Sequence, residues 1–430
     1  MRAMKDSGVE WIGEIPAEWC IKRIKIVLCE RNEKNNPIKT DEILSLTNTK
    51  GIIPYNQKGN IGNKSKEDLS DYKLAYPGDI VLNSMNVFIG SVALSSYFGC
   101  VSPVYYILYA RNQKDSIRFF NWVFQTKELQ MMLHGYGNGI MDIRMRIQMS
   151  KLNSIQLPVP YYTIQHRIAD YLDKKCAEID EIISKQHSII EKLQEYKLSL
   201  ITETVTKGLN ADAEMKDSGI EWIGEIPKHW DLCKLKHIGY LQNGISKGGE
   251  YFGYGYPFVS YGDVYKNISL PFTVEGLIDS TEEERFKYSV QEGDIFFTRT
   301  SETIEEVGFS AVCEKTIPEA TFAGFLIRVR PYNDKITKEY AKYYFRSNHH
   351  RVYLVKEMNL VTRASLGQNL LKNMIVLLPP KEEQYKIADF LNRKCAGLEK
   401  IISDKLKLII KLTEYKKSLI YEVVTGKKEV

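Results

Sequence analysis

The stretch MKDSGVEWIGEIPAEW, residues 4–19, returns as MKDSGIEWIGEIPKHW at residues 215–230, with three differences. A second pair follows in the same order, since residues 165–208 match residues 384–427 at about half of their positions without a gap. The two stretches between these repeats are of similar length and scarcely resemble one another. Two copies of the same repeated segments around divergent stretches predict one architecture that presents two different recognition surfaces.

Length and composition indicate a folded, multi-domain chain. Its 430 residues exceed one ordinary core, and 43% are hydrophobic. The net charge of +5 permits a polyanionic partner without demanding one. Seven cysteines with no CxxC pattern argue against a disulfide framework and against zinc. Without a signal-like N-terminus or a long apolar run, we expect a soluble, cytoplasmic protein with no membrane contact.

The repeats predict an α+β fold with an internal pseudo-twofold. Two similar mixed α/β domains would be separated by two long, antiparallel, coiled-coil-like helices. We expect a first recognition domain at residues 1–157, a central helical spacer at 158–208, a second recognition domain at 209–378 and a second spacer at 379–430. Strand-like runs begin near residues 79, 104, 294 and 325, and each domain carries one aromatic-rich helical stretch, residues 117–133 and 337–356. Gly78-Asp79-Ile80 aligns with Gly293-Asp294-Ile295, and Gln148 with Gln368, so the two domains share one fold.

Seven-residue apolar series predict that the two long helices pack on each other. At 1.5 Å per residue, some forty residues make a rod of roughly 60 Å. The expected contact residues are Leu172, Ile179, Ile183, Gln186, Ile190, Leu193 and Leu200, with Leu391, Leu398, Ile402, Lys405, Leu412 and Leu419. A further series, Ile182, Ile189 and Tyr196 with Ile401, Leu408 and Tyr415, widens the same apolar stripe. Gln186 and Lys405 interrupt it at equivalent positions, where they could face each other and fix register or lie at a solvated edge.

Motifs for catalysis are missing from the sequence. It contains no GxxxxGK[ST] phosphate loop, no HExxH or GxSxG, and no Asn-Pro-Pro-aromatic motif of amino-methyltransferases. The acidic run at residues 282–284 lacks a nuclease spacing and is typical of a solvated face. His349-His350, beside Arg346 and Arg351, favours phosphate contact or plain surface over a metal site. We therefore expect no catalytic residue, no metal and no cofactor on this chain.

Polar and basic side chains on predicted loops favour nucleic-acid binding. Arg suits guanine, Asn and Gln suit adenine, and Lys and Ser suit phosphates, although ordinary loop surface remains the alternative for each residue alone. The first domain offers Lys58, Lys64, Lys66, Asn83, Ser84, Asn86, Ser102, Tyr105, Tyr136, Asn138, Arg144 and Gln148. The second offers Lys247, Tyr261, Thr298, Arg299, Thr300, Ser301, Arg363, Ser365, Gln368 and Asn369.

The repeated KDSG[VI]EWIGEIP bracket with its Trp19 or Trp230, and the repeated Gln-x-x-Ile-Ala-Asp-[Tyr/Phe]-Leu, resemble the DNA-specificity (S) subunit of type I restriction-modification enzymes. The similarity covers essentially the whole chain. It implies a non-catalytic subunit whose two target recognition domains each read one half of a split sequence in double-stranded DNA. The second helix ends close to residue 430, so any ring closure with the N-terminal bracket rests on few residues.

The same resemblance implies partners. The helices would dock two methyltransferase (M) subunits, which carry S-adenosylmethionine, and restriction/translocase (R) subunits with Mg and ATP would complete the complex. Two domains on a stiff rod suit half-sites about one DNA turn (~34 Å) or a multiple apart. Two alternatives stay open: an enzyme with its own methyltransferase or nuclease chemistry, and a coiled-coil scaffold that never touches DNA.

Overall fold

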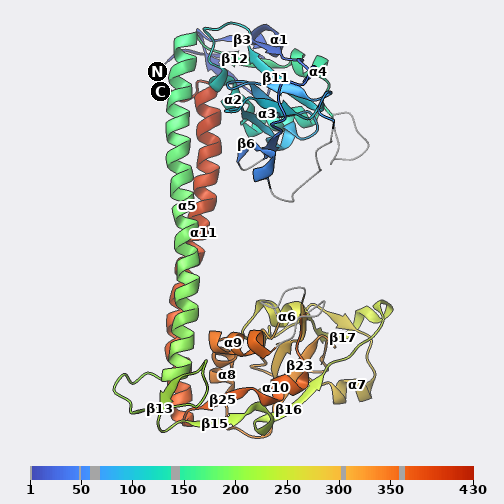
Figure 1. The fold of residues 1–430 in the computed structure, drawn as a ribbon, viewed down its shortest axis with the longest axis vertical. Helices are drawn as coiled ribbons and strands as arrows, with labels where there is room; N and C mark the ends of the chain where they lie inside the picture. Colours follow the sequence, from blue (N-terminus) through green and yellow to red (C-terminus); the bar gives the residue numbers. More distant parts are fainter. Residues whose placement is uncertain (1, 48–49, 59–67, 137–145, 302–306, 358–363) are drawn as a thin grey trace. The chain divides into compact units, whose positions relative to one another are not determined.

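The computed structural model describes residues 2–47, 50–58, 68–136, 146–301, 307–357 and 364–430. The chain divides into two compact units (Figure 1). Unit 1 comprises residues 1–187 and 406–430, and unit 2 comprises residues 188–405. Each unit therefore combines one recognition domain with part of each long helix.

The two recognition domains are built on the same antiparallel sheet. In unit 1 the order β4-β11-β8-β9 joins Leu28–Glu30, Tyr105–Ala110, Ile80–Asn83 and Val92–Leu94. In unit 2 the order β16-β23-β19-β21 joins Gly239–Asn243, Leu326–Pro331, Ile295–Thr298 and Ser310–Val312. A strand pair next to the long helix is also shared, β3 (Cys20–Arg23) with β12 (Gln156–Val159), and β15 (Asp231–Lys234) with β25 (Ile375–Leu378). The predicted strands are confirmed to within a residue.

Other elements differ between the domains. Unit 1 adds the hairpin β5 (Leu44–Thr47) with β6 (Gly51–Pro54) and a two-stranded sheet of β7 (Lys73–Ala75) with β10 (Gly99–Val101), and its short helix α1 (Ile24–Val27) stands where unit 2 has a 3-10 helix. Unit 2 instead adds α6 (Tyr261–Lys266), α7 (Glu282–Lys287) and a three-stranded sheet, β18-β17-β22, of Leu277–Ile278, Phe252–Val259 and Thr321–Phe322. These additions give the two domains unlike surfaces on a common base.

Each aromatic-rich helical stretch is two helices, where the sequence predicted one. Unit 1 has α2 (Ile117–Phe124) and α3 (Lys127–His134), and unit 2 has α8 (Lys338–Tyr344) and α9 (Asn348–Glu357). At the first break, Thr126 donates its hydroxyl to Val123 O at 2.7 Å, and at the second, Ser347 donates to Tyr344 O. Buried hydroxyl groups that bond the preceding turn compete with helix continuation.

The aligned Gly-Asp-Ile motif opens the equivalent strands β8 and β19. The glycines have φ of 89° and 86°, a left-handed conformation that favours glycine. The following Asp79 and Asp294 are buried, and each carboxylate accepts a turn N–H, at 2.9 Å and 2.8 Å. Arg31 pairs with Asp79 at 2.8 Å and Arg330 with Asp294 at 2.6 Å. Because the arginines come from different strands, the carboxylate is the shared feature.

The long helices α5 (Tyr162–Lys207) and α11 (Lys381–Val424) run antiparallel within each unit (Figure 1). In unit 1, Lys416 pairs with Asp180 at 2.6 Å. In unit 2, Lys197 pairs with Glu399. These are equivalent positions of the internal repeat, so the same contact is made once in each unit with the roles of the helices exchanged.

The predicted contact residues of the two helices are all buried or half-buried. Leu172, Ile179, Ile190, Leu391 and Leu419 are buried, and Ile183, Gln186, Leu193, Leu200, Leu398, Ile402, Lys405 and Leu412 are half-buried. The further series that flanks these residues is exposed. Ile182, Ile189, Tyr196, Ile401, Leu408 and Tyr415 are 38–57% exposed. Two of the three apolar positions in each heptad face the partner helix, and residues at the third position lie at the side of the contact, where they are exposed. Gln186 and Lys405 belong to different units, and their pairing stays a prediction.

Each repeated bracket packs on the C-terminal end of a long helix. Beyond α5, Gly208 has φ of 77° and lies so close to Trp230 that a Cβ would stand 3.2 Å from its ring. Beyond α11, Gly426 has φ of 74°, and a Cβ there would stand 3.0 Å from Trp19. Both tryptophans are almost fully buried. Each position requires glycine for two reasons: the backbone is left-handed at the helix end, and the indole ring approaches too closely for a side chain. The N-terminal bracket therefore does reach the end of α11.

A buried glutamine anchors each recognition domain to the start of its helix. Gln384 accepts from Thr337 N at 2.8 Å and donates to Lys335 O at 2.8 Å and Pro379 O at 2.9 Å. Gln165 makes the equivalent bonds in unit 1, to Ser116 N at 2.9 Å and Pro160 O at 3.0 Å. Both side chains are fully buried. This bonding explains the glutamine that opens the repeated helix motif.

Two cysteines of the long helices lie in the interior of the structure. Cys176 and Cys395 are buried at equivalent positions, and burial raises the pKa of the Cys176 thiol to about 11. Across the described ranges, no group of His, Cys, Asp and Glu side chains is placed to hold a metal ion. Among the described helices, none has the length and apolar character that crossing a membrane requires.

Replacing Gln384 by Leu is expected to destabilise unit 2 by about 1–3 kcal/mol, because Thr337 N and two carbonyl groups lose their buried partner. Urea unfolding monitored by fluorescence measures the effect. Gln194→Leu, at an exposed position of α5, is the matched control and should change the free energy of unfolding little. Equal losses in the two variants would contradict the anchoring role.

Candidate nucleic-acid interface

Two predicted segments of the second domain converge in the structure. β20 (Thr300–Ser301) pairs antiparallel with β24 (Ala364–Ser365), with Thr300 opposite Ser365. Leu366 N donates to Arg299 O at 2.7 Å and continues the ribbon. The chain then enters α10 (Gln368–Asn373). We call Asn243, Arg299, Thr300, Ser365, Gln368 and Asn369 the second loop cluster.

Asn243 is a member of this cluster that the sequence did not single out. It ends β16, and its Oδ1 accepts from Gln368 Nε2 at 2.9 Å. The two carboxamides orient each other and keep further donor and acceptor positions on both groups. Asn243 stands in a Gln-Asn-Gly turn, which marks a loop but says nothing of its partner.

Three other candidates of the second domain are used inside the fold. Thr298 is fully buried, and its Oγ1 accepts from Phe309 N at 2.9 Å. Lys247 binds Glu284 at 2.6 Å and Asp279 O at 2.8 Å. Tyr261 stacks on Tyr265 with ring centroids 5.8 Å apart. The structure does not place these three in the second loop cluster.

The first domain has a cluster at the equivalent place. Ile147 N donates to Ser84 O at 2.9 Å, the counterpart of the bond from Leu366 to Arg299. Ser84 itself is buried and donates to Val104 O at 2.7 Å. Around this bond lie Asn83 at the end of β8, Asn86 in the turn that follows, Tyr105 opposite Asn83 on β11, Ser102 in the preceding turn, and Gln148. We call Asn83, Asn86, Ser102, Tyr105, Arg146 and Gln148 the first loop cluster.

The alignment of Gln148 with Gln368 is wrong by one residue. The paired strands β12 and β25 place Gln156 at the position of Ile375, so Gln148 corresponds to Gly367. A short identity between divergent loops cannot fix register as the strand ladder does. The same region holds Arg146, which is exposed beside Ile147 and which the sequence reading missed despite its nearness to Arg144.

The remaining candidates lie elsewhere or are not described. Lys58 follows the short 3-10 helix Tyr55–Gln57, with Nζ 5.3 Å from the Tyr55 ring. Tyr136 is exposed just beyond α3. Lys64, Lys66, Asn138, Arg144 and Arg363 lie outside the described residues, as does the side chain of Ser301.

Comparison with known proteins decides the family. The family described as "Type I restriction modification DNA specificity domain" matches the chain twice, at residues 16–193 and 227–408. The chain belongs to the type I restriction-modification specificity subunits. The two matches coincide with the two recognition domains and their helices, so the internal repeat is a repeat of this DNA specificity domain.

Several named relatives are similar to this specificity subunit. The MjaVIII specificity subunit of Methanocaldococcus jannaschii is 23% identical, over 96% of this chain and 93% of the relative. The MjaX subunit of the same organism is 29% identical over 47% of each chain. The EcoKI specificity subunit of Escherichia coli is 25% identical over 62% of this chain. The chain spans about half the length of these last two, 47% and 57%.

Two solved structures share the fold. A chain from "Structural basis underlying complex assembly and conformational transition of the type I R-M system" aligns with a TM-score of 0.75 at 13% identity, over 96% of this chain and 99% of that chain. The HsdS subunit from Thermoanaerobacter tengcongensis aligns with a TM-score of 0.55 at 14% identity, over 96% and 98%. The predicted fold class is confirmed.

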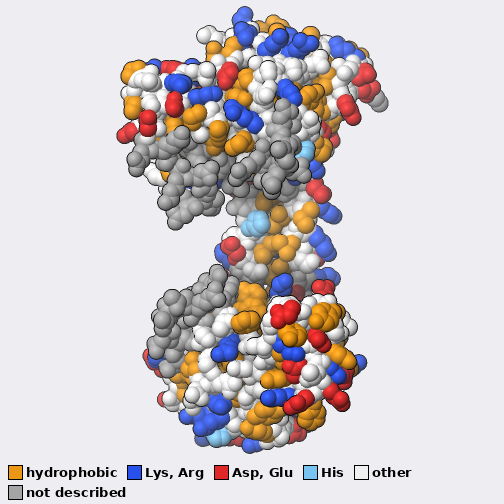
Figure 2. Space-filling view, turned by 90° about the vertical axis from the view of Figure 1, so that its right-hand side faces the viewer, with side chains coloured by type: hydrophobic (Ala, Val, Ile, Leu, Met, Phe, Trp, Pro, Cys, Tyr) orange, Lys and Arg blue, Asp and Glu red, His pale blue; other side chains and the backbone are white. Residues whose placement is uncertain are grey.

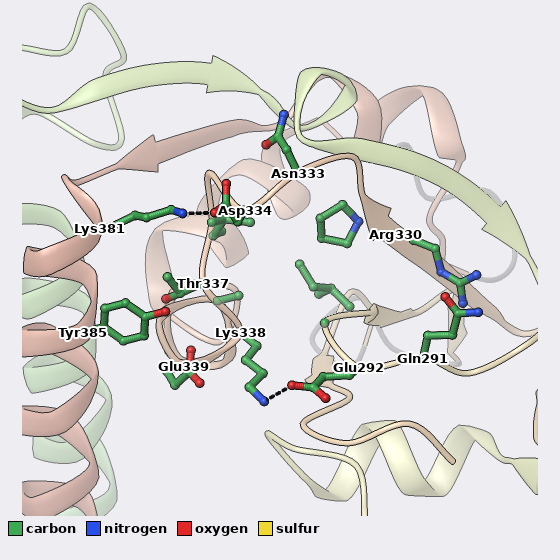
Figure 3. Close-up of a pocket in the computed structure, with 15 residues that line it drawn as sticks. Gln291, Glu292, Arg330, Asn333, Asp334, Thr337, Lys338, Glu339, Lys381 and Tyr385 are labelled. Carbon is green, nitrogen blue, oxygen red and sulfur yellow. Dashed lines mark hydrogen bonds and ion pairs between the residues drawn. The ribbon is translucent and has the colours of Figure 1, made fainter. Parts of the chain in front are cut away.

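A cavity of about 540 Å³ lies where the second recognition domain of the specificity subunit meets α11 (Figure 3). Its charged side chains bind one another, with Lys338 on Glu292 and Lys381 on Asp334. Arg330 is likewise held by Asp294. Because these charges are mutually neutralised, the cavity has no unpaired set of groups for an anionic ligand. The cavity is therefore part of the polar contact between the second recognition domain and α11.

The His349-His350 pair is buried, so the expectation of surface or phosphate contact is wrong. Each imidazole is about 5% exposed or less, and each Nε2 lacks a hydrogen-bond partner. The rings lie against the buried Tyr344 and Phe345. Burial lowers the pKa of His349 to about 3, and burial beside His349 holds the pKa of His350 well below its ordinary value.

This pair predicts a loss of stability in acid. An unfolded histidine takes up a proton below its ordinary pKa near 6.5, whereas the folded pair stays neutral, so stability that is present above pH 6.5 falls as the pH drops. Between pH 7.5 and 5.0, His350→Phe should remove about 2 kcal/mol of the wild-type loss. His237→Phe, at an exposed histidine, is the control. Urea unfolding at the two pH values measures this, and parallel losses in all three proteins would contradict it.

Proposed function

We propose that the two loop clusters read the two halves of a bipartite sequence in double-stranded DNA. One observation carries this proposal. The main-chain bond that closes each cluster is the same, from Ile147 to Ser84 and from Leu366 to Arg299, while the side chains around it differ. Two domains that share a scaffold but recognise different DNA sequences are expected to have equivalent loops with different side chains.

The chemistry of the second loop cluster suits base recognition. An arginine can bond guanine in the major groove, and a glutamine can bond adenine. Arg299 and Gln368 supply these groups, and the hydroxyl groups of Thr300 and Ser365 suit phosphates. The first loop cluster offers Arg146, Gln148 and two asparagines for the same tasks.

The helix pair serves as spacer and as docking surface in this proposal. Its exposed series, Ile182, Ile189, Tyr196, Ile401, Leu408 and Tyr415, is an uncovered apolar strip. Two methyltransferase subunits would bind it, one through each copy of the repeat. Those subunits would bring S-adenosylmethionine, and restriction/translocase subunits would bring Mg and ATP, while this chain contributes no catalysis.

Exchange of one recognition domain tests the reading role. Residues 231–378 are replaced by the corresponding segment of a related subunit, and the methylated sequence is determined after reconstitution with methyltransferase subunits. One half of the methylated sequence should change while the other half stays. A change in both halves, or in neither, would contradict modular reading.

The docking role predicts an effect of Tyr415→Ser, at a tyrosine 52% exposed on α11. Loss of this anchor should weaken binding of the methyltransferase subunit about tenfold, or about 1.4 kcal/mol. Titration by biolayer interferometry measures the dissociation constant. Tyr385→Ser removes a tyrosine 53% exposed on the same helix but off the exposed series. Equal effects of the two substitutions would refute docking on this strip.

A further inference from the structure

The second recognition domain carries a surface of exposed aromatic side chains that the loop clusters do not use. Tyr254 on β17 is 53% exposed and Phe286 on α7 is 87% exposed. We call Tyr251, Phe252, Tyr254, Tyr256 and Phe286 the aromatic ridge; all five are at least 38% exposed. Figure 2 shows hydrophobic and acidic side chains side by side on this unit. Five large aromatic side chains gathered in water mark an interaction site.

Neighbouring side chains hold the aromatic ridge in a fixed arrangement. The Arg285 guanidinium lies 3.7 Å from the centroid of the Tyr256 ring and is held by Glu319 at 2.6 Å. Lys247 lies 5.2 Å from the Tyr251 ring and is held by Glu284 at 2.6 Å. Phe258 at the end of β17 and Ile278 on the paired strand β18 are buried and belong to a separate apolar core of unit 2. The strand and α7 are thereby fixed to one another, so the ridge is preorganised.

The charge around the ridge is negative. Residues 247–287 contain seven Asp and Glu against four Lys and Arg, in a chain whose net charge is +5. Two of those acids, Glu282 and Glu283, are exposed on α7 itself. Negative charge on this scale repels a phosphate backbone and attracts a basic protein surface. DNA is therefore a poor occupant of the ridge, and a protein partner is favoured.

We propose that the aromatic ridge docks a methyltransferase subunit, through a surface on that subunit that combines Lys or Arg with an apolar pocket. Aromatic anchors with a charged rim are the composition of protein interfaces. This inference rests on the proposed function, which supplies the partner. The ridge is formed from the exposed start of β17 and from α7, and the described residues of unit 1 contain no element that corresponds to either. One of the two docked subunits therefore gains a contact that the other lacks.

Two variants of the full chain test the proposal. Tyr254→Ser combined with Phe286→Ser removes the anchors, and Glu282→Lys combined with Glu283→Lys reverses the charge. Each is titrated with the methyltransferase subunit of the same restriction-modification system, at low and high salt, by biolayer interferometry. Native mass spectrometry counts the bound subunits. The anchor variant should weaken one of two binding events at least tenfold. The charge variant should do so at low salt, with a smaller effect at high salt.

Tyr332→Ser is the matched control, because Tyr332 is 61% exposed in unit 2 but lies outside the ridge. Thermal melting checks that all variants fold. Methyltransferase binding unchanged within twofold in both ridge variants would overturn the proposal, and so would a loss of DNA binding with subunit binding intact. A wild-type chain that binds no methyltransferase subunit would instead overturn the proposed function.

Discussion

Burial of one apolar stripe of α5 against its counterpart on α11 is the constraint on which the rest of the structure depends. Helices of 46 and 44 residues gain little stability on their own and need tertiary packing of an apolar face. The pairing is antiparallel, so each unit receives the N-terminal part of one helix and the C-terminal part of the other. Leu419 and Val423 of the second repeat complete the core of unit 1, and Ile201 and Val205 of the first complete that of unit 2. Neither repeat has a complete core without the other.

The brackets follow from the same constraint. A long helix that ends in the opposite unit needs a cap there, and the bracket beside each recognition domain supplies it through a tryptophan on a left-handed glycine. At the start of each long helix, the buried glutamine bonds the backbone of the recognition domain and attaches the helix to that domain. The two repeats are thus similar in sequence where the long helices begin, pair and end. The recognition domains between these segments differ in sequence, and they carry the loop clusters and the aromatic ridge.

Periodicity and repetition allow much of this architecture to be predicted. The paired helices and the strands after Gly-Asp follow from local patterns. The exposure of Ile182 and Tyr196 does not, because three apolar positions per heptad leave open which two face the partner helix. Candidate loops were found by composition, but the ribbon of Thr300 with Ser365 joins residues far apart in sequence. The bond from Gln368 to Asn243 and the register of Gln148 likewise depend on tertiary packing.

In the proposed function, the helix pair sets the spacing between two DNA-reading domains. Inserting one heptad in each helix, after Ser184 in α5 and after the equivalent Ser403 in α11, lengthens the pair and keeps its antiparallel register. The added length is about 10 Å, or roughly three base pairs. Sequencing of the methylated sites should show a longer unspecified gap between two unchanged half-sequences. An unchanged gap in a complex that still methylates DNA would contradict the account.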